Sequence, residues 1–161
     1  NYARYYSRRM EPHVLMDAIA GATSVPTKFD DYPEVKKAIQ LPNEKTRSDF
    51  LEIFGRSERT TPCECETSLA PNLSQVLYLL NSDELERKLA AKSGTVAELE
   101  ASQQSPAEMV EELFLRTFSR RPRPAELSDA VTRMEQSPAR RAGIEDLLWT
   151  LLNSKEFLFN H

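Results

Sequence analysis

Two cysteines lie two positions apart in a charged segment of the sequence, FGRSERTTPCECETS (residues 54–68). Alternate side chains of an extended segment point to the same side, so the sulfur atoms of Cys63 and Cys65 can approach each other. Cysteines in such a pattern have three ordinary roles: small buried apolar side chains, members of a disulfide, or metal ligands. This segment is therefore where redox or ligand-binding chemistry is to be sought first.

The three possible roles of Cys63 and Cys65 require different bonding partners. Buried thiols need no partner. A disulfide between residues this close in sequence would be strained and easily reduced, and a cysteine upstream of this sequence is an alternative partner. Zinc normally takes four ligands, and the only histidines, His13 and His161, stand near the two ends of the chain without recognisable ligand spacing. We therefore expect no metal site. If a metal is bound, the alternative is that Cys63 and Cys65 are its ligands.

Charged residues of both signs accompany the cysteines. The guanidinium groups of Arg56 and Arg59 can clamp a carboxylate, sulfate or phosphate through paired hydrogen bonds, or can form ion pairs within the segment. Two glutamates two positions apart are too common to identify acid–base catalysis. The haem-attachment pattern does not occur in the sequence, so we expect no cofactor here. The candidate redox or ligand-binding loop comprises Arg56, Arg59, Cys63, Glu64, Cys65 and Glu66, and no catalytic residue is predicted.

The candidate loop, residues 56–71, is predicted to lie between two helices. Ser48 can cap the first, which contains Phe50 and Phe54, and Asn72 can begin the second, whose apolar residues recur at helical spacing. Connections longer than about 12–15 residues are uncommon in compact domains and tend to be functional or disordered. The length of the loop thus supports a role for it.

Most of the remaining sequence has helical periodicity. The first helix is expected over residues 11–22, with Gly21 weakening or ending it. Further helix starts are marked by capping or proline signals at Asn81, Thr95, Ser105, Pro124, Ser137 and Ser154. The fold class is therefore all-α, a compact orthogonal bundle of several short helices with one long cysteine-containing loop, in a single domain over residues 1–161.

Two stretches outside these helices are expected to be irregular. Residues 1–10 form a connector in this interpretation, and residues 23–46, which are broken by three prolines, contain at most a short strand over 36–41. The arginines of RRPR (residues 120–123), together with Arg140 and Arg141, are expected to be solvated helix ends.

Composition and charge limit the functional classes. The 161 residues are 40% hydrophobic and 29% charged, which fits a helix-rich globular domain. The net charge of -4 argues against a nucleic-acid binder, despite the tyrosines and arginines of residues 1–9. No stretch reaches the roughly 20 apolar residues that a membrane span requires. Since the first residue is Asn1 and not methionine, we expect the sequence to be an excerpt of a longer polypeptide.

Four phrases carry a family resemblance: FGRSERTTPCECETS, LSQVLYLLNS, EELFLRTFSRRPRPAEL and EDLLWTLLNSKEFLFNH. Together they resemble the planctomycete-specific domain of unknown function found at the C-terminal end of large exported proteins, often beside planctomycete cytochrome c domains. The resemblance extends over nearly the whole chain. The positions that match its motifs are Gly55, Arg56, Glu58, Arg59, Cys63, Glu64, Cys65, Glu66, Leu80, Asn81, Trp149, Asn153, Ser154, Phe157, Asn160 and His161.

The resemblance implies an exported or cell-envelope protein, with any c-type haem elsewhere in the parent chain, and it carries over no catalytic residue. An oxidising compartment favours oxidation of the Cys63–Cys65 region. Two functions follow as hypotheses. The first is a non-catalytic accessory or interaction domain that packs on the preceding domain of the same chain or on a cell-envelope protein, through an apolar patch near residues 1–9. The alternative is a redox-active or ligand- or metal-binding module that uses the cysteine loop in an electron-transfer or glycan-degrading assembly.

Overall fold

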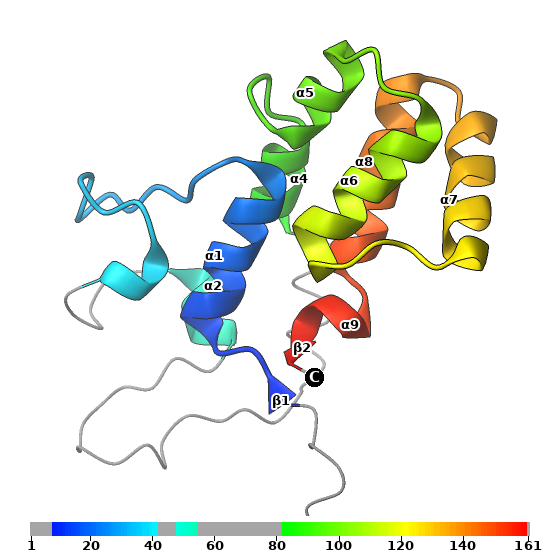
Figure 1. The fold of residues 1–161 in the computed structure, drawn as a ribbon. Helices are drawn as coiled ribbons and strands as arrows, with labels where there is room; N and C mark the ends of the chain where they lie inside the picture. The colour runs from blue at the N-terminus through cyan, green and yellow to red at the C-terminus, as the bar shows by residue number, and fades with distance from the viewer. Residues whose placement is uncertain (1–7, 42–47, 55–81, 161) are drawn as a thin grey trace, which may run out of the picture.

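The computed structural model describes residues 8–41, 48–54 and 82–160 of the chain. These residues are mostly helical, which confirms the predicted all-α class (Figure 1). The elements, in chain order, are β1 (Arg8–Arg9), α1 (Pro12–Thr23), the 3₁₀ helix η1 (Ala38–Gln40), α2 (Asp49–Ile53), α4 (Asp83–Leu89), α5 (Thr95–Ala101), α6 (Pro106–Phe118), α7 (Pro124–Gln136), α8 (Arg140–Leu152), α9 (Lys155–Leu158) and β2 (Phe159–Asn160). The predicted loop 56–71 and the helix expected after it lie outside the described residues.

Helix α8 lies at the centre of the helix packing. It contacts α4, α5, α6, α7 and α9, and its side chains Ile144 and Leu148 are fully buried. Leu113 of α6 is equally buried. Burying a leucine or isoleucine side chain contributes roughly 1.5–3 kcal/mol, so the apolar faces read from the periodicity hold the helices together.

Several of the predicted helix starts are confirmed. At α6, Ser105 Oγ accepts a hydrogen bond from the backbone N–H of Glu108 (3.4 Å), and the Glu108 carboxylate accepts one from the N–H of Ser105 (2.7 Å). Ser154 caps α9 by accepting from the N–H of Phe157, and Ser48 accepts from the N–H of Leu51. Each cap satisfies an amide that has no partner within its own helix.

Other predicted starts are shifted. The cap of α4 is Ser82, whose Oγ accepts from the N–H of Leu85, and not Asn81. Thr95 is the first residue of α5 and not its cap, because its hydroxyl donates to the carbonyl of Ala22 (2.9 Å) at the end of α1. Ser137 does not open α8: its hydroxyl donates to the carbonyl of Arg133 in α7, and α8 begins at Arg140.

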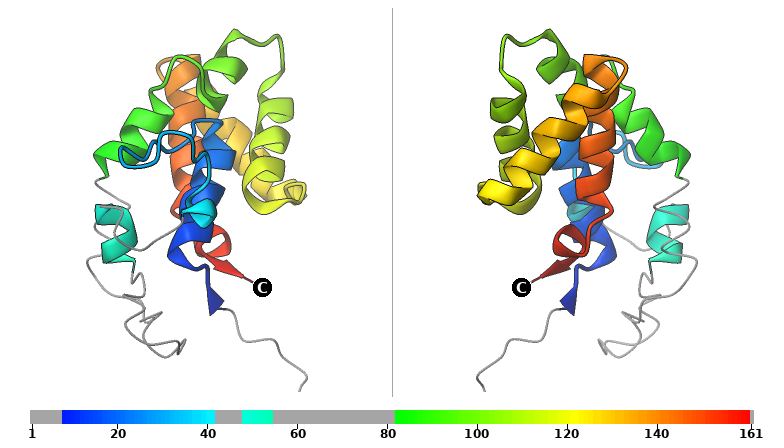
Figure 2. Two further views of the ribbon diagram at one scale, coloured as in Figure 1. Left: turned by 90° about the vertical axis from the view of Figure 1, so that its left-hand side faces the viewer. Right: turned by 90° about the vertical axis from the view of Figure 1, so that its right-hand side faces the viewer.

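The predictions for the irregular stretches need two corrections. Residues 38–40 form the 3₁₀ helix η1 and not a strand, because the Asp17 carboxylate of α1 accepts from the N–H groups of Ala38 (2.6 Å) and Ile39 (3.2 Å). The described end of the connector is also ordered, since Arg8 and Arg9 pair antiparallel with Asn160 and Phe159. The two strands lie at the same end of the molecule in both views of Figure 2.

Helix α1 has the predicted length but begins and ends one residue later, at Pro12–Thr23 and not at 11–22. It passes through Gly21 without interruption and ends only after Thr23, where Ser24 adopts a left-handed conformation with φ 56°. Gly21 is exposed, and outside the backbone of its own helix no atom lies within 4 Å of the position that a Cβ would take there. The glycine alone is therefore insufficient to end this helix, because the packing of α1 against its neighbours sets the boundary.

Three of the arginines predicted to be solvated helix ends remain exposed or partly exposed, and they also join separate parts of the fold. Arg120 forms ion pairs with Glu126 of α7 and Glu156 of α9. Arg140 donates from Nη2 to the backbone carbonyls of Leu99 in α5 and of Ser102 and Gln104 in the α5–α6 connection. Arg141 bonds the carboxylates of Glu100 and Glu145. Arginine can bond several oxygens at once because its planar guanidinium carries five donors. Arg121 and Arg123 are exposed, as expected.

Candidate functional site

The residues predicted to form the site, Arg56, Arg59, Cys63, Glu64, Cys65 and Glu66, all lie between 55 and 81, outside the described residues. His161 also lies outside the described residues, as do residues 1–7, which are most of the segment expected to carry an apolar patch. The described residues that flank the loop are Phe54, just after α2, and Ser82, the cap of α4. These two positions direct attention to the surface between α2 and α4.

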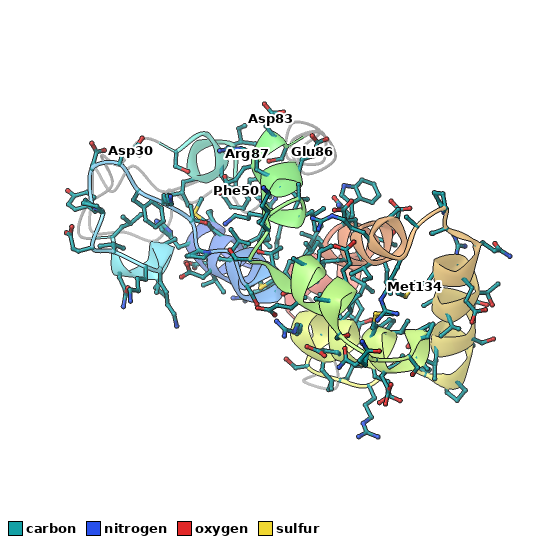
Figure 3. The ribbon with its side chains drawn as sticks, turned by 90° about the horizontal axis from the view of Figure 1, so that it is seen from above. Asp30, Phe50, Asp83, Glu86, Arg87 and Met134 are labelled. Carbon is teal, nitrogen blue, oxygen red and sulfur yellow. The ribbon has the colours of Figure 1, made fainter. Side chains whose placement is uncertain are left out.

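An open groove of about 760 Å³ occupies that surface. Its walls come from three parts of the chain: the irregular segment after α1, the start of α2, and the first turns of α4. Figure 3 shows this arrangement, with Asp30, Phe50 and Arg87 contributed by the three parts. The lining residues are Val25, Pro26, Thr27, Lys28, Phe29, Asp30, Ser48, Phe50, Ser82, Asp83, Glu84, Arg87 and Lys88.

Lys88 fastens one wall of this groove to another. Its side chain is 6% exposed, and its Nζ donates to the carbonyl of Val25 (2.7 Å) and the hydroxyl of Thr27 (3.0 Å). Burial lowers the pKa of Lys88; the Glu84 carboxylate, 3.9 Å away, opposes that shift and the Arg87 guanidinium adds to it. Since the ammonium is bonded to two oxygens of the irregular segment, its role is to hold residues 25–27 against α4.

A buried lysine with a lowered pKa is also a recognised sign of catalytic chemistry. Such a lysine needs a free electron pair directed at a substrate. At Lys88 the nitrogen points instead at the Val25 carbonyl and the Thr27 hydroxyl. The geometry therefore supports a structural role for this side chain.

The described residues that line the groove carry both signs of charge in equal number. Lys28, Arg87 and Lys88 supply three cations, and Asp30, Asp83 and Glu84 supply three carboxylates. All except Glu84 and Lys88 are exposed. A polyanion such as nucleic acid needs an excess of positive charge, whereas a polypeptide surface carries both signs. The charge balance favours a protein partner.

The floor of the groove is fixed by aromatic packing. The Phe50 ring is buried and stacks on the Phe54 ring, with centroids 4.4 Å apart and an interplanar angle of 7°. The guanidinium of Arg9 lies 4.8 Å from the centroid of the Phe54 ring. Phe50 of α2 and Ser82, the cap of α4, both line the groove, so the described elements before and after residues 55–81 both border this surface.

Sequence reasoning missed the groove residues, although one signal could have found them. In the phrase DELERKL, Lys88 stands three positions after Leu85 and beside Leu89, so it falls on the apolar face of the predicted helix. A lysine at such a position requires oxygen partners from another part of the chain. The partners in residues 25–27 were not predictable, because no local pattern links them to α4.

Among the described residues, no group of three or more histidine, cysteine, aspartate or glutamate side chains is arranged to hold a metal ion. The same part of the chain contains no helix with both the length and the apolar character that a bilayer crossing requires.

The fold and the groove define the class: an α-helical domain with an open, charge-balanced surface groove. Residues 1–134 match the family PSD1, described as a protein of unknown function (DUF1553). Because the match covers most of the chain, the chain belongs to this family. No curated protein and no solved structure matches the sequence.

The matched range ends at Met134, inside α7, and the phrase EDLLWTLLNSKEFLFNH follows it. Helix α8, which contains the first eight residues of that phrase, packs against α4, α5, α6 and α7. Its residues Ile144 and Leu148 have no exposed surface. The structural unit therefore extends past the residues that the family model matches.

Proposed function

We propose that this domain is a non-catalytic accessory or interaction module, and that it binds a protein partner through the groove between residues 25–30, α2 and α4. The observation that carries the proposal is the construction of the groove. A buried lysine fastens its walls together, and its exposed charges are balanced in sign. A preformed surface binds at a lower entropic cost than one that must be ordered on binding.

The partner in this proposal is the preceding domain of the same chain or a cell-envelope protein. The parent is proposed to be an exported, planctomycete-type protein associated with cytochrome domains, with any c-type haem outside this domain. These parts of the proposal rest on the sequence resemblance. The balanced charge of the groove supports a polypeptide partner, because protein surfaces carry both signs and align by electrostatic complementarity.

Zero-length cross-linking tests the proposal in the parent protein within its native envelope fraction. A carbodiimide joins an amine to a carboxylate that is in direct contact with it. We expect Lys28, at the rim of the groove, to be joined to carboxylates outside residues 1–161. Lys92 is also exposed but does not line the groove, so it serves as the matched control and should give no such product.

The variant Asp30→Lys reverses one exposed charge of the groove and should reduce the Lys28 products several-fold. Asp129→Lys makes the same charge change on an exposed position of α7 and should leave those products unchanged. If Lys28 and Lys92 gave only products within residues 1–161, the groove would not be a binding surface and the proposal would fail.

The alternative function is a redox-active or ligand-binding module using the Cys63–Cys65 loop in an electron-transfer or glycan-degrading assembly. One observation favours it: Phe50 of α2, the described helix before that loop, and Ser82, the cap of the next described helix, line a single groove. Thiol titration of the native protein with and without reductant, combined with metal analysis, tests this function. Thiols that react without unfolding would support it, and two inert thiols with no metal would contradict it.

A further inference from the structure

A second groove, of about 490 Å³, lies between α4 and α8. It is on a different face of α4 from the first groove: Figure 3 shows Arg87 on the side of α4 toward Asp30 and Glu86 on the other side. The residues that line it are Glu86, Leu89, Ala90, Glu145, Asp146 and Trp149. Neither the sequence analysis nor the proposed function makes use of this surface.

Trp149 gives this groove an aromatic wall. Its side chain is half-buried and packs against the hydrophobic core of the domain, so the indole is held in place on one side and borders the groove on the other. Beside it, Leu89 is buried and provides an apolar floor. A rigid indole face attracts cations more strongly than any other aromatic side chain.

The rim of the groove is acidic. Glu145 is bonded by Arg141 (Nε to Oε1, 2.7 Å), which also bonds Glu100, so one guanidinium is shared between these two carboxylates. Glu86 and Asp146 are exposed, and within the described part of the chain neither carboxylate has a hydrogen-bond or ion-pair partner. The groove thus combines two uncompensated negative charges with an indole and an apolar floor.

We propose that this groove binds an arginine side chain of a partner protein, with the guanidinium stacked on Trp149 and bonded to Glu86 and Asp146. The choice of arginine follows from its chemistry. The guanidinium is planar, is weakly hydrated, stacks on aromatic faces and bonds carboxylates in a fork geometry. The ammonium of lysine lacks the planar face and the fork. This proposal is independent of the first groove, since no residue lines both.

Trp149 is the only tryptophan of the 161 residues, so intrinsic fluorescence excited at the indole reports on this groove alone. The probe is the peptide acetyl-Gly-Arg-Gly-amide, and its control is the same peptide with citrulline, which keeps the shape and removes the charge. We expect a saturable change in Trp149 emission with the arginine peptide, and at least a five-fold weaker response with the citrulline peptide. The response should also weaken as salt is added.

The double variant Glu86→Gln and Asp146→Asn removes both uncompensated charges without changing side-chain size, and it should weaken the arginine response at least five-fold. The matched control, Asp129→Asn with Glu135→Gln, makes the same charge change at exposed positions of α7 and should bind like the unmodified chain. Equal responses to the two peptides, or an unchanged response in the double variant, would overturn the proposal. Self-association of the chain in sedimentation that the double variant abolishes would place a second copy in the groove and would overturn the proposal as well.

Discussion

The guanidinium of Arg120 bonds the carboxylate of Glu156 through two parallel hydrogen bonds, Nε to Oε1 at 2.6 Å and Nη2 to Oε2 at 2.8 Å. The same group bonds both oxygens of Glu126 at 2.8 and 2.9 Å. It also lies 5.5 Å from the ring centroids of Phe114 and Phe118. One side chain therefore ties the region following α6 to the first turn of α7 and to α9.

Replacing Arg120 with methionine should lower the free energy of unfolding by about 1–2 kcal/mol, because charge-assisted pairs are lost and two carboxylates remain close together, although partial exposure moderates the effect. Urea denaturation measures the change. Arg121→Met, at the neighbouring exposed arginine, is the control and should change stability by less than about 0.5 kcal/mol. Equal effects of the two substitutions would contradict the structural role of Arg120.

Stability should fall in acid partly through Glu126. Hydrogen bonds from Arg120 and from the backbone N–H of Arg123 lower the pKa of Glu126 from 4.5 to about 2 in the folded domain. The folded state therefore gives up this proton more readily than the unfolded state, so the stabilisation is present above about pH 4.5 and is lost between about pH 4.5 and 2. Glu126→Gln should flatten the decline of the melting temperature in that window. Glu135→Gln, an exposed change on the same helix, should leave the decline as it was.

The core assignment predicts opposite outcomes for two leucines. Leu148→Ala should lower the free energy of unfolding by about 2–5 kcal/mol, and Leu148→Asp should unfold the domain, because the side chain has no exposed surface. Leu115 of α6 is 47% exposed, so Leu115→Asp should be folded, with a circular dichroism spectrum like that of the unmodified chain. A folded Leu148→Asp variant would refute the packing around α8.

Lys88→Met should loosen the segment after α1. The substitution leaves the Val25 carbonyl without the ammonium donor seen at 2.7 Å, at a cost of about 1–3 kcal/mol if water does not replace it. Amide exchange of residues 27–30 should become faster, as measured by mass spectrometry. Lys92→Met removes an exposed lysine, and exchange of the same residues should not change in that variant.

Substitution by alanine should change the stability of the domain in opposite directions at two glycines. A Cβ added at Gly94 would lie 2.9 Å from both the Thr23 carbonyl oxygen and Val25 Cγ2, so Gly94→Ala should destabilise the domain by about 1–3 kcal/mol. At Gly21 no atom lies within 4 Å of the added carbon, and Gly21→Ala should stabilise α1 by about 0.5–1 kcal/mol. Thermal melting of the two variants should shift in opposite directions.

Local signals predicted much of this fold. The capping box at Ser105, the prolines that begin α6 and α7, and the cap at Ser154 depend only on residues within one helical turn, and all are confirmed. The spacing of apolar residues likewise placed Leu113 and Leu148 in the core. These features could be read from the sequence because the interactions behind them span four residues or fewer.

Several of the errors arose where the deciding contact is distant in sequence, although the shifted starts at Ser82 and Ser137 depend on contacts within four positions. The Thr95 hydroxyl donates to the Ala22 carbonyl, 73 positions earlier, and therefore does not cap α5. The N–H groups of residues 38 and 39 donate to the Asp17 carboxylate, 21 or more positions away. The groove depends on the bond from Lys88 to Val25, across 63 positions. The predicted cysteine loop lies outside the described residues, so its chemistry is still a prediction.

The ladder of β1 and β2 determines how the domain would respond to mechanical tension. Arg8 pairs with Asn160 and Arg9 with Phe159, and the amide of Met10 donates to the carbonyl of Leu158. In this antiparallel arrangement Arg8 and Asn160, the outer residues of the two strands, lie at the same end of the ladder. A pulling force between residues 8 and 160 would therefore load these bonds one after another, as in a zipper, and would open the ladder before the force reached the packed helices.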